Sequence, residues 1–219
     1  MSEPDPAERT RRSYDAAAED YAAWIGAELA AKPLDRALLG GFAELVRSAK
    51  TGPVADIGCG TGRISAHLAG LGLPVFGIDL APRMVALARR AHPELRFEVG
   101  TMTDLALDDA GLAGIVAWYS TIHVPDEQLP RAFAEFARTL APGGYLQLGF
   151  QAGEGVVHYE SFGEHAVALD FHRRHPEDVV AMLRRAGLQP CARTVREADV
   201  GGDFPERTPQ AFVLARKPG

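Results

Sequence analysis

A glycine-rich stretch at residues 54–63, VADIGCGTGR, combines the residue types that bind a nucleotide-like ligand. The apolar residues of 54–57 predict the end of a buried strand, and the pattern ISAHLAGL after Arg63 predicts a helix. The turn between them has three alternating glycines, Gly58, Gly60 and Gly62. Small residues let a ligand approach the backbone, and the free N–H groups of a helix N-terminus face it. The stretch therefore predicts a nucleotide pocket.

The acidic residue of this stretch, Asp56, narrows the choice of ligand. A dinucleotide would place its anionic pyrophosphate at the turn, where a carboxylate repels it. S-adenosyl-L-methionine (SAM) carries no phosphate, and its ammonium and sulfonium groups are cations. Asp56 therefore favours SAM, and Arg63, which stands where the dinucleotide fingerprint has its last glycine, points the same way.

A second acidic residue, Asp79, follows the apolar run of residues 74–78 and lies 21 residues after Gly58. At the tip of a second strand it is placed to accept hydrogen bonds from ribose hydroxyls. DIGCGTG followed by GIDLAPRMVALAR resembles motifs I and II of the class I SAM-dependent methyltransferases. The resemblance extends over about residues 10–217.

The resemblance implies an α/β fold: a Rossmann-like, doubly wound, seven-stranded sheet with helices on both faces and a reversed C-terminal hairpin. It implies one methyltransferase domain over residues 1–219, with N-terminal lid helices at 10–50 and a substrate-covering insertion at 151–175. The predicted cofactor-binding residues are Tyr14, Tyr21, Asp56, Gly58, Cys59, Gly60, Gly62, Asp79, Leu80, Met84, Thr101, Met102, Thr103 and Trp118.

Composition agrees with a single globular domain. The 219 residues are 47% hydrophobic and 24% charged, which suits one α/β core. A net charge of −6 argues against a nucleic-acid substrate. The two cysteines, Cys59 in the glycine loop and Cys191, predict no structural disulfide. With no apolar run of membrane-spanning length and no signal-peptide core, we expect a cytoplasmic protein that does not bind membranes. The sequence assigns no oligomeric state.

Aromatic residues mark the predicted lid. Tyr14, Tyr21 and Trp24 recur at helical spacing in SYDAAAEDYAAWI. In the family such a helix closes over the cofactor, and its tyrosines contact SAM or substrate. The same spacing also suits an ordinary packing stripe. We expect Tyr14 and Tyr21 at the cofactor and Trp24 at the substrate.

The segment after the third predicted strand, residues 100–105, corresponds to the family's adenine-binding loop. The family has an aspartate where this chain has Thr101, so Asp104 or a backbone carbonyl takes over the adenine amine. Met102 either packs on the adenine face or belongs to the core.

The fourth predicted strand, residues 114–119, ends in Trp118 and Tyr119 at the sheet edge where α/β proteins bind ligands. Tyr119 is a predicted substrate-binding residue. His123 follows this edge and is the first candidate for a general base, because an unperturbed histidine titrates near neutral pH. Its alternative role is to brace the loop.

The 151–175 insertion holds four of the seven histidines, His158, His165, His172 and His175. His158 and His172 are further candidates for the catalytic base and for substrate binding. His175 directly precedes a proline, so we expect it to have a structural role. The acids of the insertion match no metal-ligand motif, so we predict no metal.

The predicted function is transfer of a methyl group from SAM to O, N or C of a small molecule, with a secondary metabolite as the acceptor class. Holding acceptor and methyl group in line supplies much of the rate, and a hydroxyl acceptor also benefits from a base. One alternative is a non-methylating enzyme, such as a cyclase, that binds SAM on the same scaffold. A dinucleotide-dependent oxidoreductase is the other alternative, and Asp56 and Arg63 argue against it.

Overall fold

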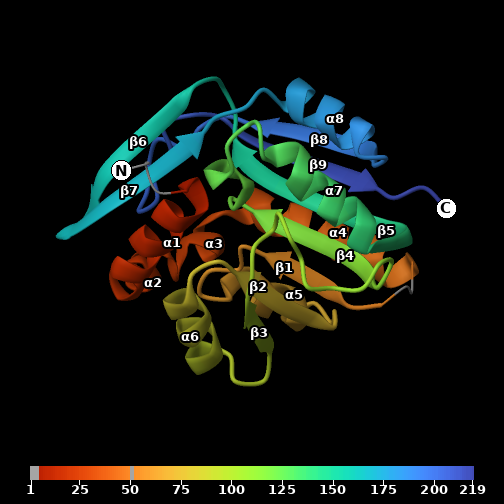
Figure 1. Cartoon of the computed structure of the whole chain (residues 1–219), viewed down its shortest axis with the longest axis horizontal. Coiled ribbons are helices and arrows are strands. Elements are labelled where there is room, and N and C mark those ends of the chain that lie inside the picture. Colours follow the sequence, from red (N-terminus) through yellow and green to blue (C-terminus); the bar gives the residue numbers. More distant parts are fainter. Residues whose placement is uncertain (1–4, 50–51) are drawn as a thin grey trace.

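A computed structural model describes residues 5–49 and 52–219, so positions 1–4 and 50–51 of the predicted domain and lid lie outside the described residues. One seven-stranded sheet organises the chain (Figure 1). Its strands are β1 (Val54–Ile57), β2 (Val75–Asp79), β3 (Arg96–Val99), β4 (Leu112–Trp118), β5 (Leu140–Gln151), β8 (Gln189–Arg196) and β9 (Gln210–Arg216). The helices are α1 (Pro6–Ala16), α2 (Ala18–Ile25), α3 (Glu28–Ala31), α4 (Pro33–Ala49), α5 (Arg63–Gly70), α6 (Pro82–Ala91), the 3-10 turn η1 (Thr121–His123), α7 (Leu129–Thr139) and α8 (Pro176–Arg185).

The strand order is β3-β2-β1-β4-β5-β9-β8. β1 to β5 run parallel, and β9 is antiparallel to both of its neighbours, β5 and β8. From β1 the chain proceeds to β2 and β3 on one side and returns to β4 and β5 on the other. The order therefore reverses between β1 and β4, which is where open α/β sheets form their ligand crevice. The predicted doubly wound sheet with its reversed C-terminal hairpin is confirmed.

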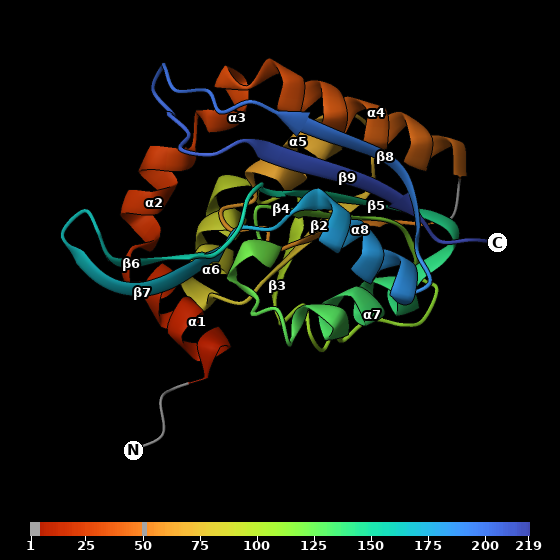
Figure 2. The ribbon, with the colours of Figure 1, turned by 90° about the horizontal axis from the view of Figure 1, so that it is seen from above.

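Helices cover both faces of the sheet because the central strands are apolar on both sides. β1 and β4 are buried along their whole length. α4 and α5 pack through Phe42 and Leu68 on one face, and α7 and α8 pack through Phe136 and Leu183 on the other (Figure 2). α4 is the longest of the described helices, with 17 residues. None of the helices described in 5–49 and 52–219 combines the length and apolarity needed to cross a bilayer.

The fifth strand differs from the predicted one. The sequence predicts a helix that stops at the Pro142–Gly144 turn and a strand over 145–150, whereas α7 already ends at Thr139 and β5 starts at Leu140. Leu140 pairs with Leu112 of β4, and the register shifts before Gly114. The turn therefore sits inside an irregular strand and not at a helix end.

The 151–175 insertion forms a second, two-stranded sheet of β6 (Val156–Phe162) and β7 (His165–His172). This hairpin lies against α1 and α2, apart from the main sheet (Figure 2). The Ala168 N–H donates to Ser13 Oγ at 2.8 Å, and His165 Nε2 lies 2.9 Å from Asp20 Oδ2. The N-terminal helices and the insertion are therefore joined into one cover over the carboxyl ends of the strands.

Candidate active site

The glycine-rich loop links β1 to α5, and all three of its glycines have positive φ angles, +76° at Gly58, +54° at Gly60 and +83° at Gly62. A Cβ on Gly58 would lie 2.2 Å from Ser120 Cβ, and one on Gly62 would lie 2.8 Å from the Phe97 ring. A Cβ on Gly60 would meet no heavy atom within 4 Å. Gly58 and Gly62 are thus required by their protein neighbours, whereas Gly60 leaves space open for a ligand.

The two acidic residues predicted at the cofactor have different surroundings. Asp79 Oδ2 accepts from the Gly60 N–H at 2.7 Å, and its Oδ1 accepts from the Ala81 N–H at 2.8 Å. Asp56 is only 1% exposed and accepts from Ser65 Oγ on α5 at 2.6 Å. Burial raises the pKa of Asp79 and raises the pKa of Asp56 to about 7. Asp79 can therefore contact a ligand directly, whereas Asp56 stabilises the glycine-rich loop from the interior of the protein.

A cavity runs from this loop along the carboxyl ends of β2, β3 and β4. Twelve of the predicted cofactor-binding residues line it: Tyr14, Tyr21, Gly58, Cys59, Gly60, Asp79, Leu80, Met84, Thr101, Met102, Thr103 and Trp118. Asp56 and Gly62 do not. Trp118 is buried, and its indole N–H has no hydrogen-bond partner among residues 5–49 and 52–219. The cavity thus offers a carboxylate and an open glycine, which fit a nucleoside bearing an amino-acid chain.

Sequence reasoning missed part of this cavity. Ala7, Thr10 and Arg11 of the first turns of α1 line it, as does Arg63 at the start of α5. The α1 residues carry no aromatic or glycine signal, and only the docking of α1 against β7 brings them to the site. Arg63 pairs with Glu28 Oε2 at 2.8 Å, which fixes its guanidinium at the cavity wall.

A second cavity adjoins the first, and four residues line both: Tyr14, Tyr21, Arg63 and Tyr119. Aromatic side chains from four separate segments wall it, namely Trp24, Tyr159, Phe162, Phe171 and Phe204. Their rings contact one another edge-on or tilted, with Trp24 centred 5.8 Å from Phe162 and 6.1 Å from Phe204. The structure therefore places Trp24 and Tyr119, which the sequence predicts at the substrate, together at an aromatic chamber beside the first cavity.

Tyr119 has an unusual backbone, with φ at +55° directly after β4. Its N–H donates to the Gly149 carbonyl at 2.8 Å, which holds the residue against the end of β5. A left-handed conformation costs a non-glycine residue about 1–2 kcal/mol. The fold therefore maintains a strained residue at the junction of the two cavities.

His123 is bound at both ring nitrogens. Its Nδ1 lies 2.9 Å from the Asp170 carbonyl, and its Nε2 lies 2.8 Å from the Tyr14 hydroxyl. A carbonyl only accepts, so Nδ1 carries the proton and Nε2 accepts from Tyr14. Burial lowers the pKa of His123 to about 4. His123 is therefore neutral near pH 7 and joins α1 to the β6–β7 hairpin.

His158 and His172 lie on the same hairpin but line neither cavity. His158 is exposed, and its Nδ1 lies 2.7 Å from Asp170 Oδ1. His172 is half-buried, and burial lowers its pKa. The structure thus brings only His123, of the three histidines predicted to be catalytic, to the cavity lining.

The buried state of His123 predicts a pH dependence of stability. Its folded pKa, about 4, lies below the ordinary 6.5, so the unfolded chain binds the extra proton as the pH falls. His123 therefore contributes about 3 kcal/mol of stability above pH 6.5, and this contribution is lost as the pH falls towards 4. Denaturant unfolding at several pH values should show a shallower acid loss in His123→Gln than in the wild type. The exposed His175→Gln is the control, and equal slopes for wild type and His123→Gln would contradict the assignment.

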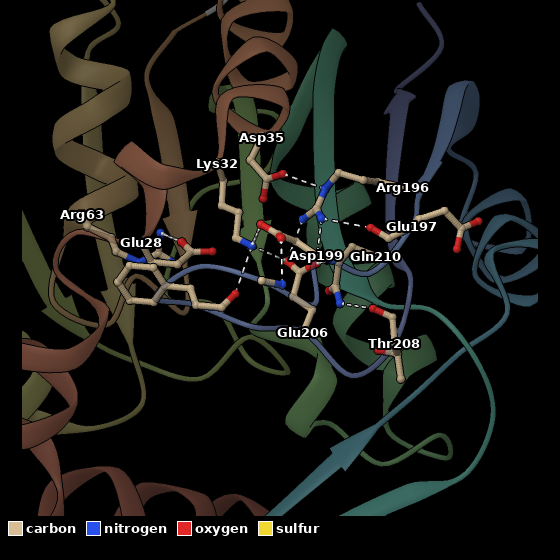
Figure 3. Close-up of polar contacts among 12 residues, drawn as sticks. Glu28, Lys32, Asp35, Arg63, Arg196, Glu197, Asp199, Glu206, Thr208 and Gln210 are labelled. Atoms are coloured by element: carbon tan, nitrogen blue, oxygen red, sulfur yellow. Dashed lines mark hydrogen bonds and ion pairs between the residues drawn. The ribbon is translucent and has the colours of Figure 1, made fainter.

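A network of ion pairs closes one side of the second cavity (Figure 3). Lys32 Nζ lies 2.8 Å from Asp199 and 3.3 Å from Glu206, and Arg196 lies 2.7 Å from Glu206 and 3.3 Å from Asp35. Asp35 lies in the first turn of α4 and Lys32 directly before that helix, whereas the others belong to β8 and the segment before β9. Despite Arg196, burial raises the pKa of Asp35 to about 6. The network attaches the 197–209 segment to the lid and so positions the Phe204 wall.

Among the residues of 5–49 and 52–219, no three His, Cys, Asp or Glu side chains are arranged to hold a metal ion.

Part of the chain is similar to known methyltransferases. Residues 54–144 match a model described as a methyltransferase domain. The ubiquinone biosynthesis O-methyltransferase of Xanthomonas axonopodis pv. citri is 34% identical over 154 residues, which are 62% of this chain and 62% of that protein. A demethylmenaquinone methyltransferase of Chlorobaculum tepidum is 34% identical over 92 residues, 42% of this chain and 37% of that protein. The chain thus spans less than two thirds of the length of these curated relatives.

Nearly the whole chain shares the fold of a solved methyltransferase. A crystal structure of magnesium protoporphyrin IX methyltransferase from Synechocystis with bound SAM superposes with a TM-score of 0.72 at 17% identity, covering 99% of both chains. The chain is therefore similar to S-adenosyl-L-methionine-dependent methyltransferases, in sequence over part of its length and in fold over nearly all of it.

Proposed function

We propose that the protein transfers a methyl group from SAM to a small molecule bound in the second cavity. The observation that carries this proposal is the junction of the two cavities at Tyr14, Tyr21 and Tyr119. A cofactor cavity that opens onto an aromatic chamber lets two reactants meet while the lid and hairpin exclude water.

The cofactor supplies an electrophilic methyl group on a sulfonium. Asp79 would hold the ribose hydroxyls, because each of its oxygens keeps a lone pair beyond the backbone N–H it already accepts. Gly60 leaves the space that the ligand needs, and Thr101, Met102 and Thr103 would surround the adenine. Asp56 keeps the loop in place through Ser65.

Tyr14 and His123 are the proposed proton-handling pair for a hydroxyl acceptor. Tyr14 lines both cavities and donates its proton to His123 Nε2, so its oxygen remains free to accept from a substrate hydroxyl. The low pKa of His123 makes it a weak base that receives a proton only while the methyl group moves. His123 thus acts first by positioning Tyr14 and second as the end of a short proton path.

We propose a flat, largely apolar acceptor of the secondary-metabolite class. The aromatic walls around Trp24 and Phe162 support this, since rings pack edge-on or offset against other rings. Of the two curated relatives described above, one is named a ubiquinone biosynthesis O-methyltransferase and the other a demethylmenaquinone methyltransferase. The first name favours oxygen over nitrogen or carbon as the methylated atom.

The test is incubation of the purified protein with methyl-labelled SAM and a panel of phenolic, amine and enol acceptors. We expect label in an acceptor and an equal amount of S-adenosylhomocysteine. Trp24→Ala should raise KM for that acceptor and leave SAM affinity unchanged, because Trp24 lines only the second cavity. SAM binding without S-adenosylhomocysteine release across the panel would favour the non-methylating alternative.

The proposal includes a cytoplasmic location and a small-molecule partner in place of a nucleic acid. Cys59 and Cys191 are both free thiols, as expected in a reducing compartment, and the net charge of −6 disfavours a phosphate backbone.

A further inference from the structure

We propose that the acceptor carries an oxyanion, a carboxylate or a phosphate, and that Arg173 and Arg207 bind it in the second cavity. The inference rests on the proposed function for the identity of this ligand as the methyl acceptor. It follows from how charges are paired around the cavity.

Both arginines lie at the same end of the sheet. Arg173 follows β7 and Arg207 precedes β9, and both line the second cavity. The Arg174 N–H donates to the Gln151 carbonyl at 3.2 Å, and the Ala152 N–H donates to the Pro209 carbonyl at 2.8 Å. The segments that carry the two arginines are therefore both attached to the carboxyl end of β5.

Arg173 and its neighbour Arg174 have opposite surroundings, because successive side chains of an extended chain point to opposite sides. Arg174 is buried and binds Asp126 together with the carbonyls of Thr121 and Val124, so it fixes the η1 turn that carries His123. Arg173 instead faces the cavity. Its Nε is buried and has no hydrogen-bond partner among residues 5–49 and 52–219.

The other charges at the cavity wall are already paired. Glu28 is paired with Arg63 at 2.8 Å, and Glu206 is paired with Arg196 at 2.7 Å. Across the described part of the chain, neither Arg173 nor Arg207 has an ion-pair partner within 4.0 Å or a side-chain hydrogen bond. The chain as a whole has a net charge of −6, yet this cavity keeps two cations unpaired. Within the described residues, the terminal nitrogens of Arg173 are accessible and unpaired, so an anionic ligand at the cavity wall can supply the acceptors and the counter-charge that this guanidinium lacks.

A guanidinium presents its N–H donors in a planar fork that matches a carboxylate or a phosphate. Gln151 and Thr208 also line the cavity beside the arginines and add neutral donors. The aromatic wall of Trp24 and Phe162 suits an apolar body. The complementary ligand is therefore an aromatic or other apolar ring that bears an oxyanion.

The experiment is calorimetric titration of the protein saturated with S-adenosylhomocysteine. The probes are 4-hydroxybenzoate, 4-hydroxyphenyl phosphate and the neutral 4-hydroxybenzamide. We expect at least one anion to bind at least about tenfold more tightly than the amide, as charge-assisted hydrogen bonds are the stronger ones. Comparing the two anions distinguishes a carboxylate acceptor from a phosphorylated one.

Matched variants locate the effect. Arg173→Gln should remove the preference for the anion and change the affinity for the amide by less than about twofold. Arg173→Lys should keep part of the preference for the anion, because a point charge remains. Arg207→Gln should have a smaller effect, since Arg207 is exposed. Arg131→Gln, an exposed residue on α7, is the control and should change nothing.

Equal affinity for amide and anions, or anion binding that survives Arg173→Gln and Arg207→Gln together, would overturn the proposal. So would the absence of binding by every probe at millimolar concentration. Binding of S-adenosylhomocysteine is measured first and separately. If it fails while the anion preference persists, the methyltransferase proposal fails and the anion site stands.

Discussion

Replacing Asp79 with alanine is expected to weaken SAM binding at least about 100-fold. The change removes the proposed acceptor for the ribose hydroxyls, and a hydrogen bond to a charged group contributes about 1.5–3 kcal/mol. It also removes the acceptor of the Gly60 and Ala81 N–H groups, which holds the loop in its binding shape. A loss of about 2.7 kcal/mol already corresponds to 100-fold in affinity. Calorimetric titration with SAM and S-adenosylhomocysteine measures the effect.

Two comparisons separate this role from general damage. Asp79→Asn places an amide N–H₂ against one of the two backbone N–H groups, so it should also bind weakly, although it is almost the same size. Asp108→Ala, in the exposed loop before β4, should bind as the wild type does. Asp79→Ala that folds and retains SAM affinity within about threefold would show that Asp79 does not hold the cofactor.

The second large effect is expected at Gly58. A methyl group there would lie 2.2 Å from Ser120 Cβ, in a residue whose φ is +76°. Overpacking typically costs about 1–3 kcal/mol, and the left-handed backbone adds about 1–2 kcal/mol. Gly58→Ala should therefore lower the free energy of unfolding by about 2–5 kcal/mol and abolish SAM binding. Denaturant unfolding in the absence of ligand measures the first effect, and titration measures the second.

Gly60 provides the matched control for that substitution. It has a positive φ of +54°, but a Cβ there meets no protein atom within 4 Å. Gly60→Ala should cost only about 1–2 kcal/mol of stability and still lose SAM, because its methyl group occupies ligand space. Gly58→Ala combined with Ser120→Gly should recover part of the stability. Equal stability losses at Gly58 and Gly60 would contradict the packing argument.

The sheet and the cofactor loop could be predicted from sequence because local signals specify them. The run around Asp56 and Gly58 contains a strand end, a turn that needs positive φ and a helix start within ten residues. Asp79 follows an equally plain strand. Parallel strands that are buried on both faces read as apolar runs, and this made the doubly wound sheet predictable.

The substrate side was harder to predict, because it depends on contacts between distant segments. Nothing local indicates that Trp24, Phe162 and Phe204 share one cavity, since they come from α2, the hairpin and the segment before β9. The hairpin histidines illustrate the same limit. Their spacing is visible in the sequence, but the pairing of β6 with β7 and the acid at Asp170 decide that His158 lies outside both cavities.

The buried charges were also beyond sequence reasoning. Lys32 and Asp35 look like the solvated start of a helix, yet both are at most 5% exposed because the 197–209 segment covers them. That segment reads as a polar turn, and its role as a cavity wall follows only from its ion pairs with Lys32 (Figure 3).

The most direct test is a calorimetric titration of the full chain with SAM, S-adenosylhomocysteine and NADH in parallel. We expect one-to-one binding of the first two, loss of both in Asp79→Ala, and no heat with NADH, because Arg63 places a side chain where a dinucleotide-binding loop has its last glycine. Saturable NADH binding, or no binding of SAM and S-adenosylhomocysteine by the folded protein, would contradict the account.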